Sequence, residues 1–387
     1  MKARIRKANL IFLGSLCMVL LLVGITFLSA CSSSSKTTTT QTSQTTNATT
    51  SAQASTTTSA TTSTVTPITL VLSNYESATV YHSTDLLQPW IAELEERSGG
   101  RIKIEAHYNE EIVKMNDTYD ALIKGTVDIA NFIPHIVTGK FAMYQVEAFS
   151  PYNYEGYRLS RIVTELYQQF PEEQAEFAGL QPLLFYGFSS YVGTKDVPIK
   201  TLEDGKGLKM IMAGETAAER AKALGWTPLD APPPEVYSMF QTGVADGGGV
   251  VALGDLAGGF KWGELIKHVT LVPTNRLCTA YAMNKAKFDS LPADLQALLI
   301  EMMDKYADVG DQMENLKSAK DIEAAKAMGV NFYTLSSDEV ARWMAADEPV
   351  KNAYIAKLNA AGLPGDKLYN TYFELEKKYS DSQYQYK

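Results

Sequence analysis

The chain has 387 residues, and 45% of them are hydrophobic, as in a globular protein with a substantial core. Its formal net charge is -9, and the first thirty residues hold four basic side chains and no acid, so the remainder is more acidic still. Such a body excludes nucleic acid and anionic membrane surfaces as expected partners. Of three cysteines, two lie in or beside the N-terminal leader, which leaves Cys278 alone in the body without an intramolecular disulfide partner.

The first thirty residues have the pattern of an export signal. A basic start precedes an apolar run from Leu10 to Phe27, and Leu-Ser-Ala-Cys at 28–31 matches the bacterial lipobox. In the lipoproteins that this leader resembles, a diacylglyceryl group is attached to the sulfur of Cys31 and the peptide is cut before it. The alternative is a plain transmembrane anchor, since about 18 apolar residues can span a bilayer. In both cases the body lies outside the cytoplasm.

The next segment, residues 31–66, is predicted to be a disordered tether that begins at the lipidated Cys31. After Cys31 it consists almost entirely of Ser, Thr, Gln and Ala, with a single charge at Lys36. Such a composition has nothing to bury, so it is expected to stay flexible. The folded domain is therefore predicted over 67–387.

Strand and helix patterns alternate at the start of this domain. Strands are predicted over 68–73, 101–107 and 127–132, and helices over 81–97 and 116–124 lie between them. Glycines follow both helices, as expected at helix ends. This order favours a doubly wound α/β sheet.

Two long strands and one long helix are predicted further along the chain. Residues 181–191 and 276–283 are apolar strands, and the first is long enough to leave one lobe and enter a second. Between them, residues 199–251 form a small α/β unit, whose strand over 208–212 ends where open sheets bind ligands. The apolar pattern over 292–328 predicts a helix of about 55 Å, long enough to brace both lobes. A strand over 330–335 and helices that start near Ser336 and Pro364 complete the chain.

Four segments of the domain carry a resemblance to a known family. They are SGGRIKIEAHY at 98–108, ALIKGTVDIA at 121–130, EVYSMFQTGVADG at 235–247 and MNKAKFDSLPADLQALL at 283–299. In this order and spacing they resemble the extracytoplasmic solute-binding proteins of TRAP transporters, of the dicarboxylate-binding (DctP) type. The resemblance covers the chain from about Ile68 to its C-terminus.

The resemblance implies an α/β fold of two lobes, like type II periplasmic binding proteins, with doubly wound sheets joined by crossing strands and a long bracing helix. Lobe I is expected over about 67–185 with part of 250–285, and lobe II over about 186–250 with the C-terminal helices. The implied activity is capture of a small organic solute by hinge closure and delivery to the membrane subunits of a TRAP-type permease. No catalysis, cofactor or metal is implied, and a monomer is expected.

Three positions depart from the polar pattern of this family. The family usually has an arginine two residues after the lysine of GLK, which clamps the solute carboxylate, and this chain has Ile211 there. An asparagine that assists the clamp corresponds to Val250, and a second basic residue aligns with Tyr191. Burying a carboxylate without a cation costs several kcal/mol. We therefore predict a solute that is neutral or aromatic and is not held by the usual clamp.

The predicted binding residues are mostly aromatic or soft side chains, because rings stack on a solute while hydroxyls orient it. Only a few of them are expected to touch the solute, with the rest in the core. Arg276 is included as a spare cation, and His82 because it follows the loop after the first strand. The set is Tyr75, Tyr81, His82, Phe132, Tyr191, Ile211, Met212, Tyr237, Val250 and Arg276, with Trp262 and Tyr281 as further candidates for the lining.

Other functions and sites find less support in the residues. The four histidines lack metal-ligand spacing, and no nucleophile motif surrounds Cys278, so neither a metal site nor an enzyme is predicted. Lys209 and Arg220 are expected on solvated faces. A structural or adhesive lipoprotein would explain the leader but not the two-lobe pattern. The nearest alternative is a lipoprotein receptor of an ABC-type importer, which shares the architecture and differs in its permease.

Overall fold

A computed structural model of the chain describes residues 66–149 and 158–380. The chain divides into two compact units, residues 1–62 and 63–387, and every described residue belongs to the second. The predicted leader, Cys31 and the tether lie outside the described residues. Among the helices of the described ranges, none is long and apolar enough to cross a bilayer.

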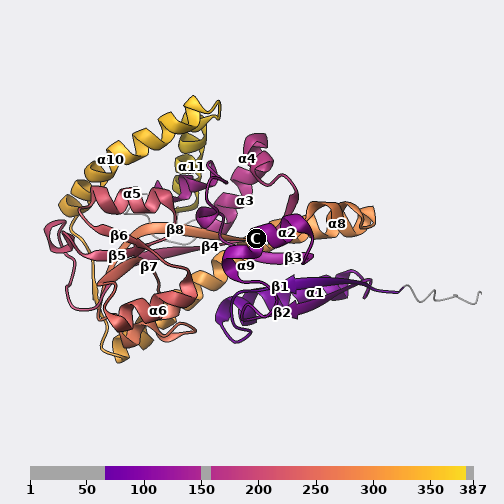
Figure 1. Ribbon diagram of the computed structural model, residues 1–387, viewed down its shortest axis with the longest axis horizontal. Helices are drawn as coiled ribbons and strands as arrows, with labels where there is room; N and C mark the ends of the chain where they lie inside the picture. Colours follow the sequence, from indigo (N-terminus) through magenta and orange to yellow (C-terminus); the bar gives the residue numbers. More distant parts are fainter. Residues whose placement is uncertain (1–65, 150–157, 381–387) are drawn as a thin grey trace, which may run out of the picture. The chain divides into compact units, whose positions relative to one another are not determined.

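A mixed sheet forms the centre of the described domain (Figure 1). Its strand order is β2-β1-β3-β8-β4-β7-β5-β6, with β9 beside β8. Parallel pairing joins β2, β1 and β3 at one end and β7, β5 and β6 at the other. The strands are β1 (Ile68–Ser73), β2 (Ile102–His107), β3 (Ile129–Phe132), β4 (Leu180–Thr194), β5 (Lys209–Met212), β6 (Thr227–Asp230), β7 (Gly247–Ala252), β8 (His268–Asn284) and β9 (Asn331–Tyr333).

The two long antiparallel strands, β4 and β8, connect the two parallel groups. β8 pairs with β3 over residues 280–283 and with β9 over 268–270. β4 pairs with β8 along its length and with β7 over residues 190–194. These are the predicted crossing strands, and the two-lobe α/β fold is confirmed. The lobes share one continuous sheet because β4 and β8 bond to strands of both groups.

Helices cover both faces of the sheet, and Figure 1 shows α5 and α10 on the side opposite α6. The α-helices are α1 (Gln88–Arg97), α2 (Thr118–Lys124), α3 (Leu159–Gln169), α4 (Pro171–Glu176), α5 (Glu215–Ala223), α6 (Pro233–Thr242), α7 (Gly254–Ala257), α8 (Lys285–Asp289), α9 (Ala293–Ala327), α10 (Ser337–Ala360) and α11 (Gly365–Ser380). Shorter helical turns are η1 (His82–Leu87), η2 (Met115–Asp117), η3 (Pro134–Ile136), η4 (Tyr144–Phe149), η5 (Glu203–Gly205) and η6 (Trp262–Glu264).

Most predicted elements lie within a few residues of the observed ones. The strand over 68–73 has the predicted bounds, and the long helix predicted over 292–328 is α9. The helix predicted over 81–97 is instead divided, because η1 is a π-helical turn and α1 begins only at Gln88. Pro89 has no N–H to donate to the preceding turn, so a regular α-helical ladder is interrupted there.

The bracing helix α9 packs against β4, α1, α3 and α7, so it contacts elements from both ends of the sheet. Asp311 in its middle is fully buried. The carboxylate of Asp311 accepts hydrogen bonds from the N–H groups of Ser160 and Arg161, at 2.9 and 3.1 Å. Carboxylates at a helix N-terminus satisfy donors that have no partner within the helix. The contact therefore fixes the start of α3 on α9.

The alternation of side chains along β5 separates two apolar clusters. Ile211 points into a cluster with Val250, Leu277 and Trp262, whereas the next residue, Met212, belongs to a different cluster. Successive side chains of a strand point to opposite faces of its sheet. Ile211, where the resemblance implies a clamp arginine, therefore faces one side of the sheet, and Met212 faces the other.

Arg220 corrects a sequence prediction, because it does not lie on a solvated face. It is 2% exposed. Its Nε and Nη2 donate to Asp347 Oδ2 of α10 at 3.0 and 2.6 Å, and its Nη1 donates to the carbonyls of Thr274, at 2.6 Å, and Ala148. Asp347 lies 127 residues further along the chain, so no local pattern indicates this pair. Lys209 is exposed, as predicted.

Candidate functional site

A small cavity, here called the inner cavity, lies where several strand ends meet the crossing strands. Its lining follows the carboxyl ends of β1, β3, β5 and β7, the part of an open α/β sheet that binds ligands. It has a volume of about 40 Å³, the space of roughly one water. The lining residues are Tyr75, Glu76, His82, Ile133, Ile136, Phe188, Ala213, Ala231, Pro233, Val236, Val250, Asp255, Phe260, Trp262 and Leu277.

Most of the wall of the inner cavity is apolar or aromatic. Phe188 of β4 lies opposite Leu277 of β8 in the register of the crossing strands. Phe260 and Trp262 stack with ring centroids 5.3 Å apart and planes 19° apart. Among the described residues that line this cavity there is no lysine or arginine. A carboxylate clamp of the usual kind is therefore absent from the described lining.

Three buried ionisable side chains interrupt this apolar wall. Glu76, His82 and Asp255 are 6%, 3% and 3% exposed. His82 Nδ1 lies 2.7 Å from Glu76 Oε1. Glu76 Oε2, His82 Nε2 and Asp255 Oδ1 have no hydrogen-bond partner among the described atoms. Buried polar atoms are nearly always paired, so three unpaired atoms at one cavity indicate a partner from outside the chain.

The charges of this cluster depend on its burial. Burial by itself would lower the pKa of His82, but the nearby carboxyl groups of Glu76, Asp255 and Glu314 raise it to about 9. Burial raises the pKa of Asp255 to about 7, with His82 opposing the rise and Glu76 adding to it. At neutral pH His82 is therefore a cation, and Asp255 lies near the midpoint of its titration.

Glu314 of α9 lies close enough to His82 to act on it electrostatically, and its carboxylate accepts hydrogen bonds from two tyrosine hydroxyls. The hydroxyl of Tyr81 donates to Glu314 Oε2 at 3.2 Å, and the hydroxyl of Tyr186 donates to the same oxygen. The Tyr81 ring packs on the ring of His82, with centroids 4.0 Å apart. A Cβ added at Gly254 would lie 2.4 Å from the Tyr81 hydroxyl, so any side chain there must displace the Tyr81 ring. Tyr81 thus packs against the His82 ring and helps to hold it in position.

The structure brings several predicted site residues to the inner cavity. Tyr75, His82 and Val250 line it, together with Trp262. These residues come from both ends of the sheet.

Three further predicted residues pack in the apolar cluster that includes much of the cavity wall. They are Tyr191, Ile211 and Tyr237. Ile211 is fully buried, and the hydroxyl of Tyr237 donates to Glu264 Oε2 at 2.8 Å. None of the three belongs to the described lining of the inner cavity.

Other predicted residues lie elsewhere. Arg276 faces away from its neighbour Leu277, and its Nη1 is 2.6 Å from Glu376 Oε1 of α11. Phe132 lines a separate hollow beside Tyr119. Tyr281 packs in the core cluster around η1 and α9. Their positions separate them from the unpaired atoms of Glu76, His82 and Asp255.

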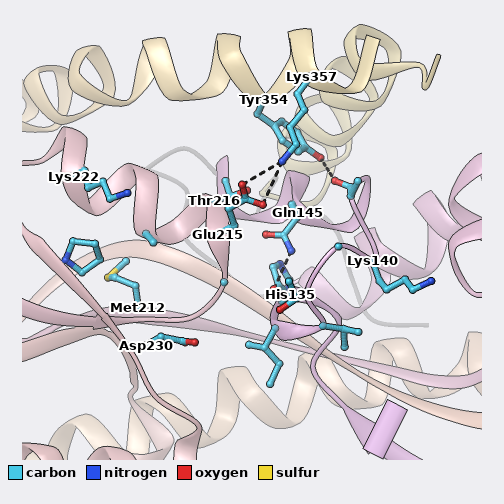
Figure 2. Close-up of a pocket in the computed structure, with 18 of the residues that line it drawn as sticks. His135, Lys140, Gln145, Met212, Glu215, Thr216, Lys222, Asp230, Tyr354 and Lys357 are labelled. Atoms are coloured by element: carbon cyan, nitrogen blue, oxygen red, sulfur yellow. Dashed lines mark hydrogen bonds and ion pairs between the residues drawn. The ribbon is translucent and has the colours of Figure 1, made fainter. Parts of the chain in front are cut away.

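Met212 lines a wide cleft of about 630 Å³ between the loop after β3, the start of α5 and α10 (Figure 2). Two of the polar groups at its rim have partners within the chain. The ammonium group of Lys357 contacts the Glu215 carboxylate at 3.3 Å, and the hydroxyl of Tyr354 donates to the carbonyls of Ala142 and Met143. Figure 2 shows Lys357 and Glu215 meeting across the cleft. These contacts tie α10 to the start of α5 and to the residues that precede η4.

His135 also lines the wide cleft, as Figure 2 shows. It is 4% exposed, and burial lowers its pKa to about 3, so it is neutral. Its carbonyl accepts a hydrogen bond from Gln145 Nε2 at 3.1 Å. Within the part of the chain that the structure describes, no group of three or more His, Cys, Asp or Glu is placed to bind a metal ion.

Sequence reasoning missed Glu76, Phe188 and Asp255. Asp255 has a visible signal, since it is the only charged residue in the apolar, glycine-rich run GVVALGDLAGGF at 249–260. Acids are almost never fully buried unless they are paired, so an acid in such a run indicates a special role. Glu76 has a weaker signal, its position just after the carboxyl end of β1. Phe188 has none, because it is one of several aromatic residues in the crossing strand.

The amino-acid sequence of the chain matches a known protein family and several of its members. The family described as bacterial extracellular solute-binding protein, family 7, matches residues 73–357. The C4-dicarboxylate-binding periplasmic protein DctP of Rhodobacter capsulatus is 26% identical over 271 residues, which are 69% of this chain and 80% of that protein. The ectoine-binding periplasmic protein TeaA of Halomonas elongata is 30% identical over 187 residues, 48% of this chain and 51% of its own.

Solved structures share the fold. A TRAP solute-binding protein from Rhodoferax ferrireducens, in complex with copurified benzoate, has a TM-score of 0.74 and 25% identity, over 81% of this chain and 98% of its own. One from Bordetella bronchiseptica with bound mandelate has a TM-score of 0.74 and 22% identity, over 81% and 100%. The family match spans the crossing strands and every residue of the inner cavity. The chain therefore belongs to the bacterial extracellular solute-binding proteins, family 7.

Proposed function

We propose that the protein is an extracytoplasmic receptor that captures a small organic solute and delivers it to a TRAP-type permease. The observation that supports this most strongly is the family match over 73–357, which includes all elements around the inner cavity. The proposal involves no chemical step, because the receptor binds and releases its solute unchanged.

Capture follows from the way the inner cavity is built. Its lining comes from the ends of β1 and β3 on one side and of β5 and β7 on the other, with the crossing strands as floor. We assign lobe I to about 67–185 with part of 250–285, and lobe II to about 186–250 with the C-terminal helices. A solute that contacts both lobes stabilises their closed arrangement, and opening widens the narrow cavity.

The body of the solute is apolar or aromatic in this proposal. Val250, Phe188 and Trp262 contribute apolar wall, and Ile211 is fully buried nearby in place of a clamp arginine. Solved proteins of this fold carry mandelate, benzoate and 3-hydroxybenzoate, which supports a solute the size of a single ring. A dicarboxylate such as succinate finds no lysine or arginine in the described lining.

The N-terminal segment ties this receptor to the membrane. The lipobox predicts a diacylglyceryl group on Cys31, and the Ser/Thr-rich composition of the segment that follows predicts a flexible tether. A flexible chain of this length has an end-to-end distance of about 30 Å. The domain therefore stays close to the outer side of the membrane, where a permease would accept the solute.

The experiment that tests the function measures thermal unfolding and scattering radius of the chain without residues 1–31. We expect a solute with a ring to raise the unfolding temperature by several degrees and reduce the radius, with little effect of succinate or malate. Tight binding of succinate would contradict the missing clamp. If no solute of any class changes either quantity, the receptor function is wrong.

A further inference from the structure

The inner cavity has aromatic walls, and it also contains carboxyl oxygens that can accept hydrogen bonds but have no donor. Carboxylate oxygens only accept hydrogen bonds, and Glu76 Oε2 and Asp255 Oδ1 both lack a partner. A buried carboxylate without a donor costs free energy. The cavity is therefore complementary to a group that donates hydrogen bonds.

The other acids near the inner cavity have partners of their own. Glu314 and Asp321 of α9 both act on Asp255 electrostatically. Glu314 accepts from two tyrosine hydroxyls, and Asp321 is bonded to Lys317. The ammonium group of Lys317 also lies 5.1 Å from the centroid of the Tyr81 ring. Lys317 is thus already paired, and His82 is the basic side chain in contact with Glu76.

We infer that the solute carries a protonated amine, which binds against Glu76 Oε2 and Asp255 Oδ1 while its apolar body packs on the aromatic wall. The inference rests on the proposed receptor function and names the chemical class of its solute. A primary ammonium has three N–H donors. Protonated His82 is already paired with Glu76 Oε1, so Glu76 Oε2 and Asp255 Oδ1 are the acceptors that remain for the ammonium.

The aromatic wall supports the same class of solute. The faces of Tyr, Trp and Phe rings attract cations, and the lining contains Tyr75, Phe188, Phe260 and Trp262. Sites that recognise organic ammonium groups combine such rings with few charges. The inner cavity has this composition, whereas the wide cleft of Figure 2 is rimmed by lysines and a glutamate.

A carboxylate bound to protonated His82 is the competing arrangement. It would add a further carboxylate beside Glu76 and Asp255, and like charges in a buried site repel one another. It would also leave Glu76 Oε2 and Asp255 Oδ1 without donors. The amine supplies donors to both oxygens, so the geometry favours the cation.

The two arrangements predict opposite responses to pH. An amine competes with protons for Asp255, whose pKa is about 7, so its affinity falls as the pH drops below that value. A carboxylate needs protonated His82, whose pKa is about 9, and gains affinity as Asp255 becomes neutral. The sign of the pH dependence therefore separates them.

Titration calorimetry of the full chain in detergent, with benzylamine, benzyl alcohol and benzoate, tests the inference. The three compounds share one ring and differ in charge. We expect benzylamine to bind about tenfold or more tightly than either of the others near neutral pH. Its affinity should fall about fivefold or more between about pH 8 and about pH 6.

Variants of the two acids locate the amine. Glu76→Gln and Asp255→Asn remove one charge each at nearly constant volume, and each should weaken benzylamine about tenfold or more. Asp289→Asn, at an exposed acid of α8 paired with Lys285, is the matched control and should leave the affinity unchanged. The unfolding temperature of each variant shows whether it folds. If a variant does not fold, the pH dependence of benzylamine affinity in the unaltered chain tests the inference instead.

Benzoate binding more tightly than benzylamine, with affinity that rises toward low pH, overturns the inference and leaves the receptor function standing. Equal binding of all three compounds overturns it as well. If none of the three binds and the thermal experiment finds no other solute, the receptor function fails together with the inference.

Discussion

The two faces of the sheet differ in how they hold buried charge. On the face of α5, α10 and α11, Arg220 and Arg276 are bound to Asp347 and Glu376, each at 2.6 Å. At the inner cavity on the other face, Glu76 and Asp255 keep oxygens without a donor. The arginine pairs join distant parts of the chain, whereas the unpaired oxygens join nothing within the described residues. The two arginine pairs hold the fold, whereas the unpaired oxygens of Glu76 and Asp255 lie where we infer that a solute binds.

The largest effect is expected from breaking an arginine pair. Arg220→Met leaves Asp347 buried without its cation and should reduce the free energy of unfolding by about 3–5 kcal/mol. Lys222→Met on the same helix removes an exposed pair with Glu219 and should cost less than about 1 kcal/mol. Urea unfolding measures both. Equal losses of unfolding free energy in the two variants would show that the buried Arg220–Asp347 pair contributes no more to stability than an exposed pair.

A smaller effect is expected from a substitution that crowds the Tyr81 ring, which packs on His82. In Gly254→Ala the new Cβ would lie 2.4 Å from the Tyr81 hydroxyl, so the ring must move. The loss should be about 1–3 kcal/mol, with weaker solute binding. Tyr81→Leu removes the ring, so the double variant should lose less than the sum of the two single losses. Strict additivity would contradict the contact.

Asp255 and His82 should make the solute-free protein less stable as the pH rises. The pKa of Asp255 is raised from 3.8 to about 7, so its contribution to stability is complete below about pH 4 and is lost as the pH rises through about 7. The pKa of His82 is raised from 6.5 to about 9, so its contribution is lost as the pH rises through about 9.

Asp255→Asn should remove the part of this decline between about pH 4 and about pH 7, an effect of at most a few kcal/mol. Burial also raises the pKa of Asp311 to about 7, so the contribution of Asp311 to the decline in stability remains in this variant. Unfolding temperatures across this range provide the measurement. An unchanged slope in the variant would mean that Asp255 is not neutral when buried.

The smallest effect is expected at the wide cleft. Lys357→Ala removes the exposed contact with Glu215 and should cost less than about 1 kcal/mol, an amount that high salt reduces. Solute affinity should not change, because the inner cavity lies on the other face. A marked loss of affinity in this variant would place the solute in the wide cleft instead.

Most of the fold could be predicted from the sequence, because alternation and helical periodicity are local. The strand over 68–73 and the helix near 292–328 are examples. The division of the predicted helix at 81–97 was missed, although Pro89 offered a local reason. The motif order indicated the family before any contact was known.

The site could be predicted only in part. Tyr75 was predicted for its ring, His82 for its place after the first strand and Val250 from the resemblance, and all three line the inner cavity. Arg276 and Glu376 lie 100 residues apart, so the sequence does not show that this cation is already paired. Whether an acid such as Glu76 is buried depends on tertiary packing, which is why the charge of the cavity was missed.

The most direct test is mass spectrometry of the solute that is released from the full chain after purification under native conditions. We predict a small amine with an apolar or ring-bearing body, bound at about one copy per chain and absent from preparations of the Asp255→Asn variant. A dicarboxylate such as succinate, released at the same occupancy from both proteins, would contradict the cation site.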